Sequence, residues 1–247
     1  MYILPELLLE AIASKAAFAP DGTTRPLESN VSREEAEALY LAIRSIQPTN
    51  SLEIGLAHGI SALAILGAIS ANGAGHHYVI DPFQQNYANC GEAMITLAGF
   101  AERHTFLEHF PEEVIPQLPR LQFALIDASH LFDLTVMEFA LIDKKLDIGG
   151  IVALHDLWMP SQQAVVRFIL ANRSYETYRN FSTAEPQLSI QAHCKELISK
   201  VLRKMPGANQ IFGSNVLHPW STFRVRNLVF LRKFADDHRD WRFHQRF

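Results

Sequence analysis

Apolar and polar positions recur along the chain with two different periods, which separate expected strands from expected helices. Short apolar runs bounded by turn residues predict buried strands, and longer runs with apolar residues three and four positions apart predict helices. Their alternation predicts βαβ units, and therefore a parallel sheet with helices on both faces. The strands are expected near residues 51–55, 77–81, 104–107, 121–127 and 149–155, and the helices near 60–70, 90–99, 111–117, 131–145 and 160–171.

The N-terminal segment has a pattern of its own. Its apolar side chains fall on one face of an expected amphipathic helix, and a turn-rich stretch follows at residues 19–26. Ser32 and Glu35 then form a capping box, which predicts the start of the next helix. We therefore expect residues 1–30 to be an N-terminal helix and linker.

Residues 31–247 are expected to form a single domain, because the chain length suits one sizeable core. The C-terminal third has the weakest pattern. Residues 175–179 and 227–232 are the candidates for a sixth and a seventh strand. The segment between them, at about 181–225, is expected to be an insertion that lies near the functional edge or at a subunit contact.

Composition narrows the class of protein. The chain is 48% hydrophobic and 19% charged, which is typical of a globular protein, and its net charge of −4 argues against nucleic acid as a partner. The two cysteines lie far apart, as expected in a reducing cytoplasm, and no apolar run is long enough to span a membrane. The expected partner is a small molecule, and the chain is a candidate homodimer.

The most specific chemistry lies at the carboxyl ends of the first two expected strands. Glu53, Gly55 and Gly59 form a strand–turn–helix junction, and Asp81 ends the next strand. In open α/β sheets such a turn binds an adenosine, because the glycines let the backbone approach the ligand and the acid binds the ribose hydroxyls.

The spacing of the glycines helps to select the cofactor. Dinucleotide folds use G-x-G-x-x-G to place a pyrophosphate, whereas this turn has three residues between its glycines and no Lys or Arg. Glu53, just before the first glycine, suits a ligand that carries a positive group. These features favour S-adenosylmethionine and argue against a nicotinamide-dependent oxidoreductase.

Four motifs in order resemble those of the class I S-adenosylmethionine-dependent methyltransferases. They are Glu53–Leu63 in the first strand and helix, Ile80–Gln84 after the second strand, Phe123–His130 at the fourth strand and Leu146–Asp156 at the fifth. The branch that the chain most resembles includes small-molecule and sugar O-methyltransferases. The resemblance implies a Rossmann-like, doubly wound, mostly parallel seven-stranded sheet with an antiparallel last strand. It also implies methyl transfer to a small-molecule acceptor, with a hydroxyl oxygen as the expected target.

The fourth and fifth strands end in groups suited to deprotonating such an acceptor. Asp127 and Asp156 are expected to face the methyl-transfer position, where two carboxylates could hold a magnesium-like ion. His130 is the expected general base, and Asp127 and His155 are further catalytic candidates. Either a general base or a metal ion could promote deprotonation of the acceptor hydroxyl, and the sequence does not decide between them.

The remaining candidates are expected at the cofactor. Phe83 and Phe110 are the expected walls of the adenine site, and His109 lies at the same edge of the sheet. Ser61 is expected to cap the helix that follows the glycine turn, to donate to the methionine carboxylate of the cofactor, or both. A non-catalytic protein that binds S-adenosylmethionine remains an alternative to an enzyme.

Overall fold

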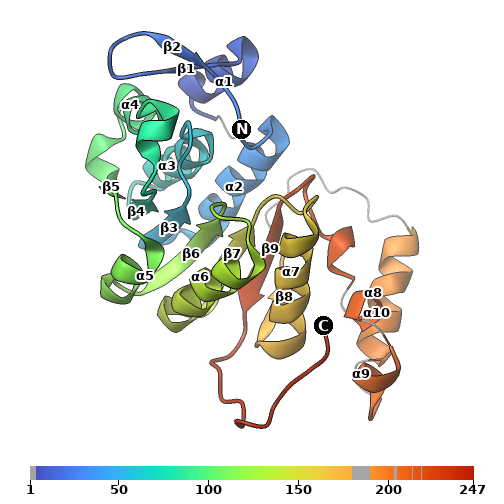
Figure 1. The fold of residues 1–247 in the computed structure, drawn as a ribbon. Coiled ribbons are helices and arrows are strands. Elements are labelled where there is room, and N and C mark those ends of the chain that lie inside the picture. Colours follow the sequence, from blue (N-terminus) through green and yellow to red (C-terminus); the bar gives the residue numbers. More distant parts are fainter. Residues whose placement is uncertain (1–3, 180–189, 203–204, 213, 218) are drawn as a thin grey trace.

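All five expected apolar runs form strands, and two further strands complete one sheet (Figure 1). The structure, a computed structural model, describes residues 4–179, 190–202, 205–212, 214–217 and 219–247. The strands are β3 (Asn50–Ile54), β4 (His76–Ile80), β5 (His104–Leu107), β6 (Leu121–Ile126), β7 (Leu146–Leu154), β8 (Tyr175–Thr177) and β9 (Val229–Lys233).

The order of the strands is β5-β4-β3-β6-β7-β9-β8. Strands β3 to β7 pair in parallel, and β9 lies between β7 and β8, antiparallel to both. The predicted seven-stranded, mostly parallel sheet with an antiparallel last strand is therefore confirmed. The chain reverses its direction of winding between β3 and β6, and ligands bind outside the strand ends at such a point in open α/β sheets.

Helices cover both faces of the sheet because its central strands bury side chains on each side. Along β6, Phe123 and Leu125 belong to one hydrophobic core, whereas Ala124 and Ile126 belong to the other. The first core lies against α1 (Glu6–Ser14), α2 (Arg33–Ile46), α3 (Ile60–Asn72) and α4 (Cys90–Leu97). The second lies against η3 (Ile115–Gln117), which continues the short helix α5 (Pro111–Val114), and against α6 (Phe132–Lys145) and α7 (Pro160–Asn172).

The N-terminal segment contains more structure than we predicted. After α1, the expected linker forms an antiparallel hairpin of β1 (Ala16–Phe18) and β2 (Thr24–Pro26). Leu8 and Ala11 of α1 are fully buried, so the amphipathic helix packs on the domain. Ser32 and Glu35 form the predicted capping box at the start of α2.

The predicted insertion between β8 and β9 contains helices in its described part. These are α8 (Ile190–Leu202), α9 (Ala208–Ile211), α10 (Ser214–Leu217) and the 3₁₀ turn η4 (Trp220–Thr222). Helix α10 contacts both α8 and α7, and the three lie side by side in Figure 1. Residues 181–189 of the insertion lie outside the described residues. Among the helices that the structure describes, none is long and apolar enough to cross a membrane.

Candidate functional site

The carboxyl ends of the central strands border two adjoining cavities. The first cavity has a volume of about 500 Å³ and the second about 420 Å³. Both are bordered by Gly55, Ala57, Tyr87, Asp127 and Ala128. Two of these shared residues follow β3 and two follow β6, so the cavities meet at the point where the winding reverses. The sequence predicted a site at this edge of the sheet.

The glycine turn after β3 has the expected form, but packing within the sheet also requires Gly55. Gly55 has a φ of +92°, and a Cβ atom added there would lie 2.1 Å from the carbonyl oxygen of Asp127. Gly59, with a φ of +82°, is the N-cap of α3 and closes the turn. The absence of a side chain at Gly55 therefore allows β3 to pack closely against the end of β6, as well as opening the cavities.

Glu53 lies beneath this turn and borders neither cavity, although we expected it to contact the cofactor. Its buried carboxylate accepts a hydrogen bond from the Ser61 hydroxyl and lies 3.1 Å from Nε2 of His77. Burial raises the pKa of Glu53 to about 8 and lowers the pKa of His77 to about 3. Because a net charge is costly in this environment, the pair holds one proton between the two groups.

Ser61 does not cap its helix, because Gly59 occupies the N-cap position of α3. The hydroxyl of Ser61 instead donates to Glu53, eight residues earlier, and the side chain also borders the first cavity. Its expected contact with the cofactor therefore remains a prediction.

Asp81, at the end of β4, is buried and holds the neighbouring turns together. Its Oδ2 accepts hydrogen bonds from the backbone N–H groups of Leu56 and Ala57, at 3.1 and 3.2 Å, and from Gln84 Nε2 at 3.0 Å. Its Oδ1 accepts from the backbone N–H of Phe83 at 2.8 Å. Each carboxylate oxygen has two acceptor lone pairs, and Oδ1 uses one of them, so Oδ1 is the atom with capacity left for a ligand hydroxyl. Asp81 borders the second cavity, where the ribose contact was expected.

The two predicted aromatic walls meet at the second cavity. The rings of Phe83 and Phe110 lie edge to face, with centroids 5.8 Å apart, and both side chains are about half exposed. His109 points elsewhere: it borders neither cavity, and its Nδ1 lies 3.5 Å from the Glu113 carboxylate on the surface. The structure thus brings together the two phenylalanines but leaves His109 outside the site.

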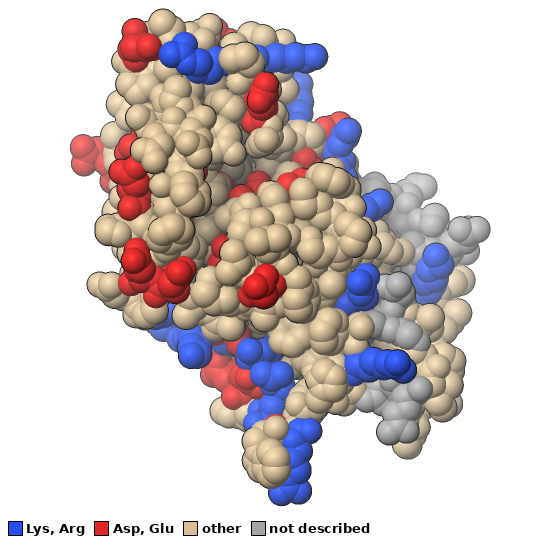
Figure 2. Space-filling model, viewed as in Figure 1, with Lys and Arg blue, Asp and Glu red and all other residues tan. Residues whose placement is uncertain are grey.

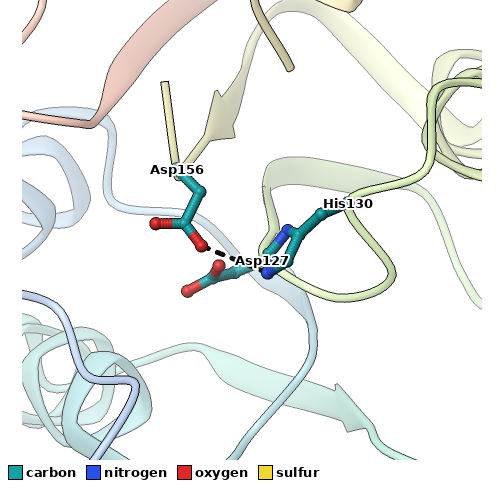
Figure 3. A group of neighbouring side chains, drawn as sticks. All are labelled: Asp127, His130 and Asp156. Atoms are coloured by element: carbon teal, nitrogen blue, oxygen red, sulfur yellow. Dashed lines mark ion pairs between the residues drawn. The ribbon is translucent and has the colours of Figure 1, made fainter. Parts of the chain in front are cut away.

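Asp127, His130 and Asp156 all border the first cavity, and Figure 3 shows their side chains gathered together. Nε2 of His130 lies 3.1 Å from Oδ2 of Asp156, and one potential ligand atom from each residue lies within 4.8 Å of the others. Both His130 and Asp156 have a positive φ, which turns the chain sharply just after β6 and β7. The sequence predicted Asp127 and Asp156 as a metal pair, and the structure adds the imidazole of His130 to that group.

His155, expected to be catalytic, is buried among carboxylates and cannot serve as a free base. Its Nδ1 lies 3.2 Å from Asp127 Oδ1, and its Nε2 lies 3.5 Å from Glu35 Oε2. Burial lowers the pKa of His155, but the interactions with Asp127 and Glu35 outweigh this effect and raise it to about 10. His155 is therefore an imidazolium at neutral pH, and it orients Asp127.

Glu35 is the residue at this site that we did not predict. The capping box was visible in the sequence, but the contact with His155, 120 residues later, was not. Burial raises the pKa of Glu35, whereas the neighbouring imidazole of His155 and the hydrogen bonds from Ser32 and from the backbone N–H of Asn227 lower it, to a net value of about 2. The signal that could have identified Glu35 is that its side chain both caps α2 and is buried. The local sequence pattern shows the capping box, but it does not show the burial.

The charge around the two cavities is negative. The described residues that border them include no Lys or Arg, and against the single imidazolium of His155 stand five acidic side chains: Asp81, Glu112, Asp127, Glu138 and Asp156. In Figure 2, acidic atoms lie in the groove that crosses this face, and Lys and Arg lie around its outside. Such a site favours a ligand that carries positive charge and disfavours a pyrophosphate.

Comparison with known families identifies the central part of the chain. A family model described as a methyltransferase domain matches residues 52–157. This match agrees with the resemblance of the sequence motifs to class I S-adenosylmethionine-dependent methyltransferases. The matched region extends from β3 to just beyond Asp156, so it includes the glycine turn and the Asp127–His130–Asp156 cluster. A comparison with curated proteins gives no match.

Solved methyltransferases share the fold of this chain at low sequence identity. An O-methyltransferase of Streptomyces achromogenes involved in tomaymycin synthesis, solved with S-adenosylmethionine, is 16% identical, with a TM-score of 0.57 over 70% of this chain and 81% of its own. An O-methyltransferase of Bacillus cereus, solved with S-adenosylhomocysteine, is 15% identical, with a TM-score of 0.56 over 71% of this chain and 82% of its own. A Podospora anserina methyltransferase, bound to S-adenosylhomocysteine, is 17% identical, with a TM-score of 0.56 over 70% and 82% of the two chains.

Proposed function

We propose that this methyltransferase transfers the methyl group of S-adenosylmethionine to a hydroxyl oxygen of a small molecule, with His130 as the proton acceptor. The contact between His130 and Asp156 on the wall of the first cavity carries the proposal. The acceptor would occupy the first cavity, and the adenosine would occupy the second, beside Asp81 and Phe83. The O-methyltransferases with the same fold support oxygen as the target.

S-adenosylmethionine carries its own activated methyl group, so the protein must bind, align and deprotonate. When Nε2 of His130, which lies 3.1 Å from Asp156, carries the ring proton, Nδ1 is the nitrogen that can accept a proton from the methyl acceptor. Asp156 then stabilises the imidazolium that forms and holds its orientation. The proton moves from the hydroxyl to His130 as the methyl group moves from sulfur to oxygen. The product is a neutral thioether and a methyl ether.

The same cluster supports a second arrangement. Two carboxylates and one imidazole are suitable ligands for a divalent ion, and Asp127, His130 and Asp156 would hold it. Such an ion, when bound, lowers the pKa of a hydroxyl group beside it. His130 cannot be a metal ligand and the proton acceptor through the same lone pair, so the two arrangements make different predictions.

The test begins with binding and proceeds to turnover. Calorimetric titration with S-adenosylmethionine, S-adenosylhomocysteine and NADH should show binding of the first two alone. Methyl transfer to a panel of small hydroxylated acceptors is then followed with and without a chelator. With His130 as the base, His130→Ala should lower the rate by about 10²–10⁴-fold while chelation has no effect. His109→Ala is the matched control, because this exposed histidine borders neither cavity.

Other outcomes assign other functions. Loss of activity in chelator and recovery with a divalent ion would favour the metal arrangement, and Asp156→Asn should then weaken the recovery. Binding of the cofactor without transfer to any acceptor would favour a non-catalytic binding protein. Binding of NADH in preference to S-adenosylmethionine would refute the proposal.

A further inference from the structure

Glu138 is a buried carboxyl group in the middle of α6 that has no hydrogen-bond partner in the described part of the chain. Its residue is 3% exposed, and the side chain borders the second cavity together with Leu134 and Met137. Among the described residues, neither of its carboxyl oxygens has a hydrogen-bond partner, and Oε2 is also shielded from solvent. An unpartnered buried acceptor costs about 1–3 kcal/mol. The simplest explanation is that a bound ligand supplies the hydrogen-bond partner that the carboxyl group of Glu138 lacks.

The surroundings of Glu138 determine its protonation state. Burial raises its pKa to about 7, and the charge of Glu112 on α5 acts in the same direction. Asp81 and Asp127, at the ends of β4 and β6, border the same cavity, and none of the described residues that border it is a Lys, Arg or His. The buried amide of Gln162 on α7 donates to Thr135, which lies three residues before Glu138 on α6. Near neutral pH, a large fraction of Glu138 therefore carries a proton, and its carboxyl group offers one donor and one acceptor side by side.

The rest of the second cavity indicates which ligand group would lie there. Asp81 has one oxygen available for a ribose hydroxyl, and the rings of Phe83 and Phe110 form an apolar wall. A purine base placed against that wall needs a polar partner at its edge. Adenine presents an amino donor next to a ring-nitrogen acceptor, which complements a protonated carboxyl group.

We propose that Glu138 binds the adenine of the cofactor, its carboxyl group pairing with the edge that carries the exocyclic amino group. In the protonated side-chain carboxyl group of Glu138, the C=O oxygen accepts a hydrogen bond from the adenine amino group, and the O–H donates one to the adjacent ring nitrogen. Glu138 is thus a specificity-determining residue that distinguishes adenine from bases without this edge. The inference rests on the proposed binding of S-adenosylmethionine and assigns a part of the cofactor to a residue of α6.

The experiment measures the affinity of the full chain for two probes. One is S-adenosylhomocysteine, and the other is its analogue with hydrogen in place of the adenine amino group. The unmodified chain should bind the analogue about tenfold more weakly, which is the loss of one or two buried hydrogen bonds. Glu138→Leu should bind S-adenosylhomocysteine about tenfold more weakly and should no longer discriminate between the probes. This loss of discrimination is a coupling that a merely structural role would not produce.

Two further variants keep the test decisive. Glu138→Gln offers the same donor and acceptor without titrating, so it should retain affinity and discrimination from pH 6 to pH 8.5. Over the same range the unmodified chain should lose affinity, since ionisation removes the donor. Asp133→Asn, an exposed acid in the first turn of α6 that borders neither cavity, should change nothing.

Two results would overturn the proposal in distinguishable ways. If the unmodified chain does not bind S-adenosylhomocysteine, the proposed function fails, and the role of Glu138 fails with it. If the chain binds it but Glu138→Leu and the unmodified chain discriminate equally between the probes, the role of Glu138 alone is refuted.

Discussion

Substitution of Gly55 by alanine should destabilise the fold far more than the backbone conformation of the residue alone would require. A Cβ atom at this position would lie 2.1 Å from the Asp127 carbonyl oxygen, so this oxygen must retreat by about 1.3 Å to reach ordinary contact at 3.4 Å. That oxygen belongs to the end of β6, which pairs with β3 through the hydrogen bond from Asp127 N–H to the Ile54 carbonyl, at 3.0 Å. The retreat therefore separates two central strands of the sheet.

The expected magnitude has two parts. A positive φ costs an alanine about 1–2 kcal/mol, and the smaller conformational entropy of the unfolded chain offsets part of this cost. Loss of the buried hydrogen bond between Asp127 and Ile54 adds about 1–3 kcal/mol. We therefore expect Gly55→Ala to cost about 3 kcal/mol. In a domain of this size such a change lowers the Tm by about 6–12 °C.

Gly73 provides the matched control. It has a φ of +81°, close to that of Gly55, but an added Cβ atom would meet nothing within 4 Å. Gly73→Ala should therefore cost only about 1 kcal/mol, the conformational part. Urea unfolding followed by circular dichroism gives both free energies. Equal destabilisation by the two substitutions would show that the contact with Asp127 does not constrain Gly55.

Two further predictions concern the buried charges. In the folded protein the pair of Glu53 and His77 holds one proton between about pH 3 and 8, whereas in the unfolded chain the two groups titrate at 4.5 and 6.5. Both states therefore hold one proton between pH 4.5 and 6.5, and the contribution of the pair to stability is greatest in that range. Raising the pH from 6.5 to 8 should cost about 2 kcal/mol of unfolding free energy, and in Glu53→Gln this loss should disappear; a loss that persists in the variant would assign it to other groups. Glu35→Gln should lower the pKa of His155 in an NMR titration, because one of its two carboxylate partners is removed. Glu34→Gln, which removes an exposed ion pair with Arg226, should leave that pKa unchanged, and equal effects would contradict the role of Glu35.

The sheet could be predicted because its signals are local. Each of the five parallel strands is a short apolar run bounded by turn residues, and the predicted bounds of β5 agree with the structure at both ends. The hairpin of β1 and β2 was missed because each strand has only three residues, which is too short for a periodic pattern. The antiparallel direction of the last strand was implied by the family resemblance, whereas the position of β9 between β7 and β8 was not predicted, because no local signal in the sequence indicates it.

The candidate site was predictable in its location and less so in its roles. Residues at strand ends must meet at one edge of a parallel sheet, so the convergence of Asp81, Asp127 and Asp156 followed from the topology. The direction of each side chain did not follow from it. Glu53 was expected to face the ligand, but its side chain contacts His77 instead. His77 lies on the neighbouring strand β4, two residues before Val79, the residue that pairs with Glu53. Only tertiary contacts decide between these two directions.

Glu35 shows that the fold and the site share one set of hydrogen bonds. Its carboxylate accepts from the Ser32 backbone at 2.7 Å to cap α2, and from the Asn227 backbone at 2.7 Å just before β9. The same carboxylate lies 3.5 Å from His155, which holds Asp127 at the boundary of the two cavities. Three segments far apart in the sequence therefore meet at a single side chain. Because Asp127 is positioned through this series of contacts, the antiparallel strand β9 also helps to fix the geometry of the site.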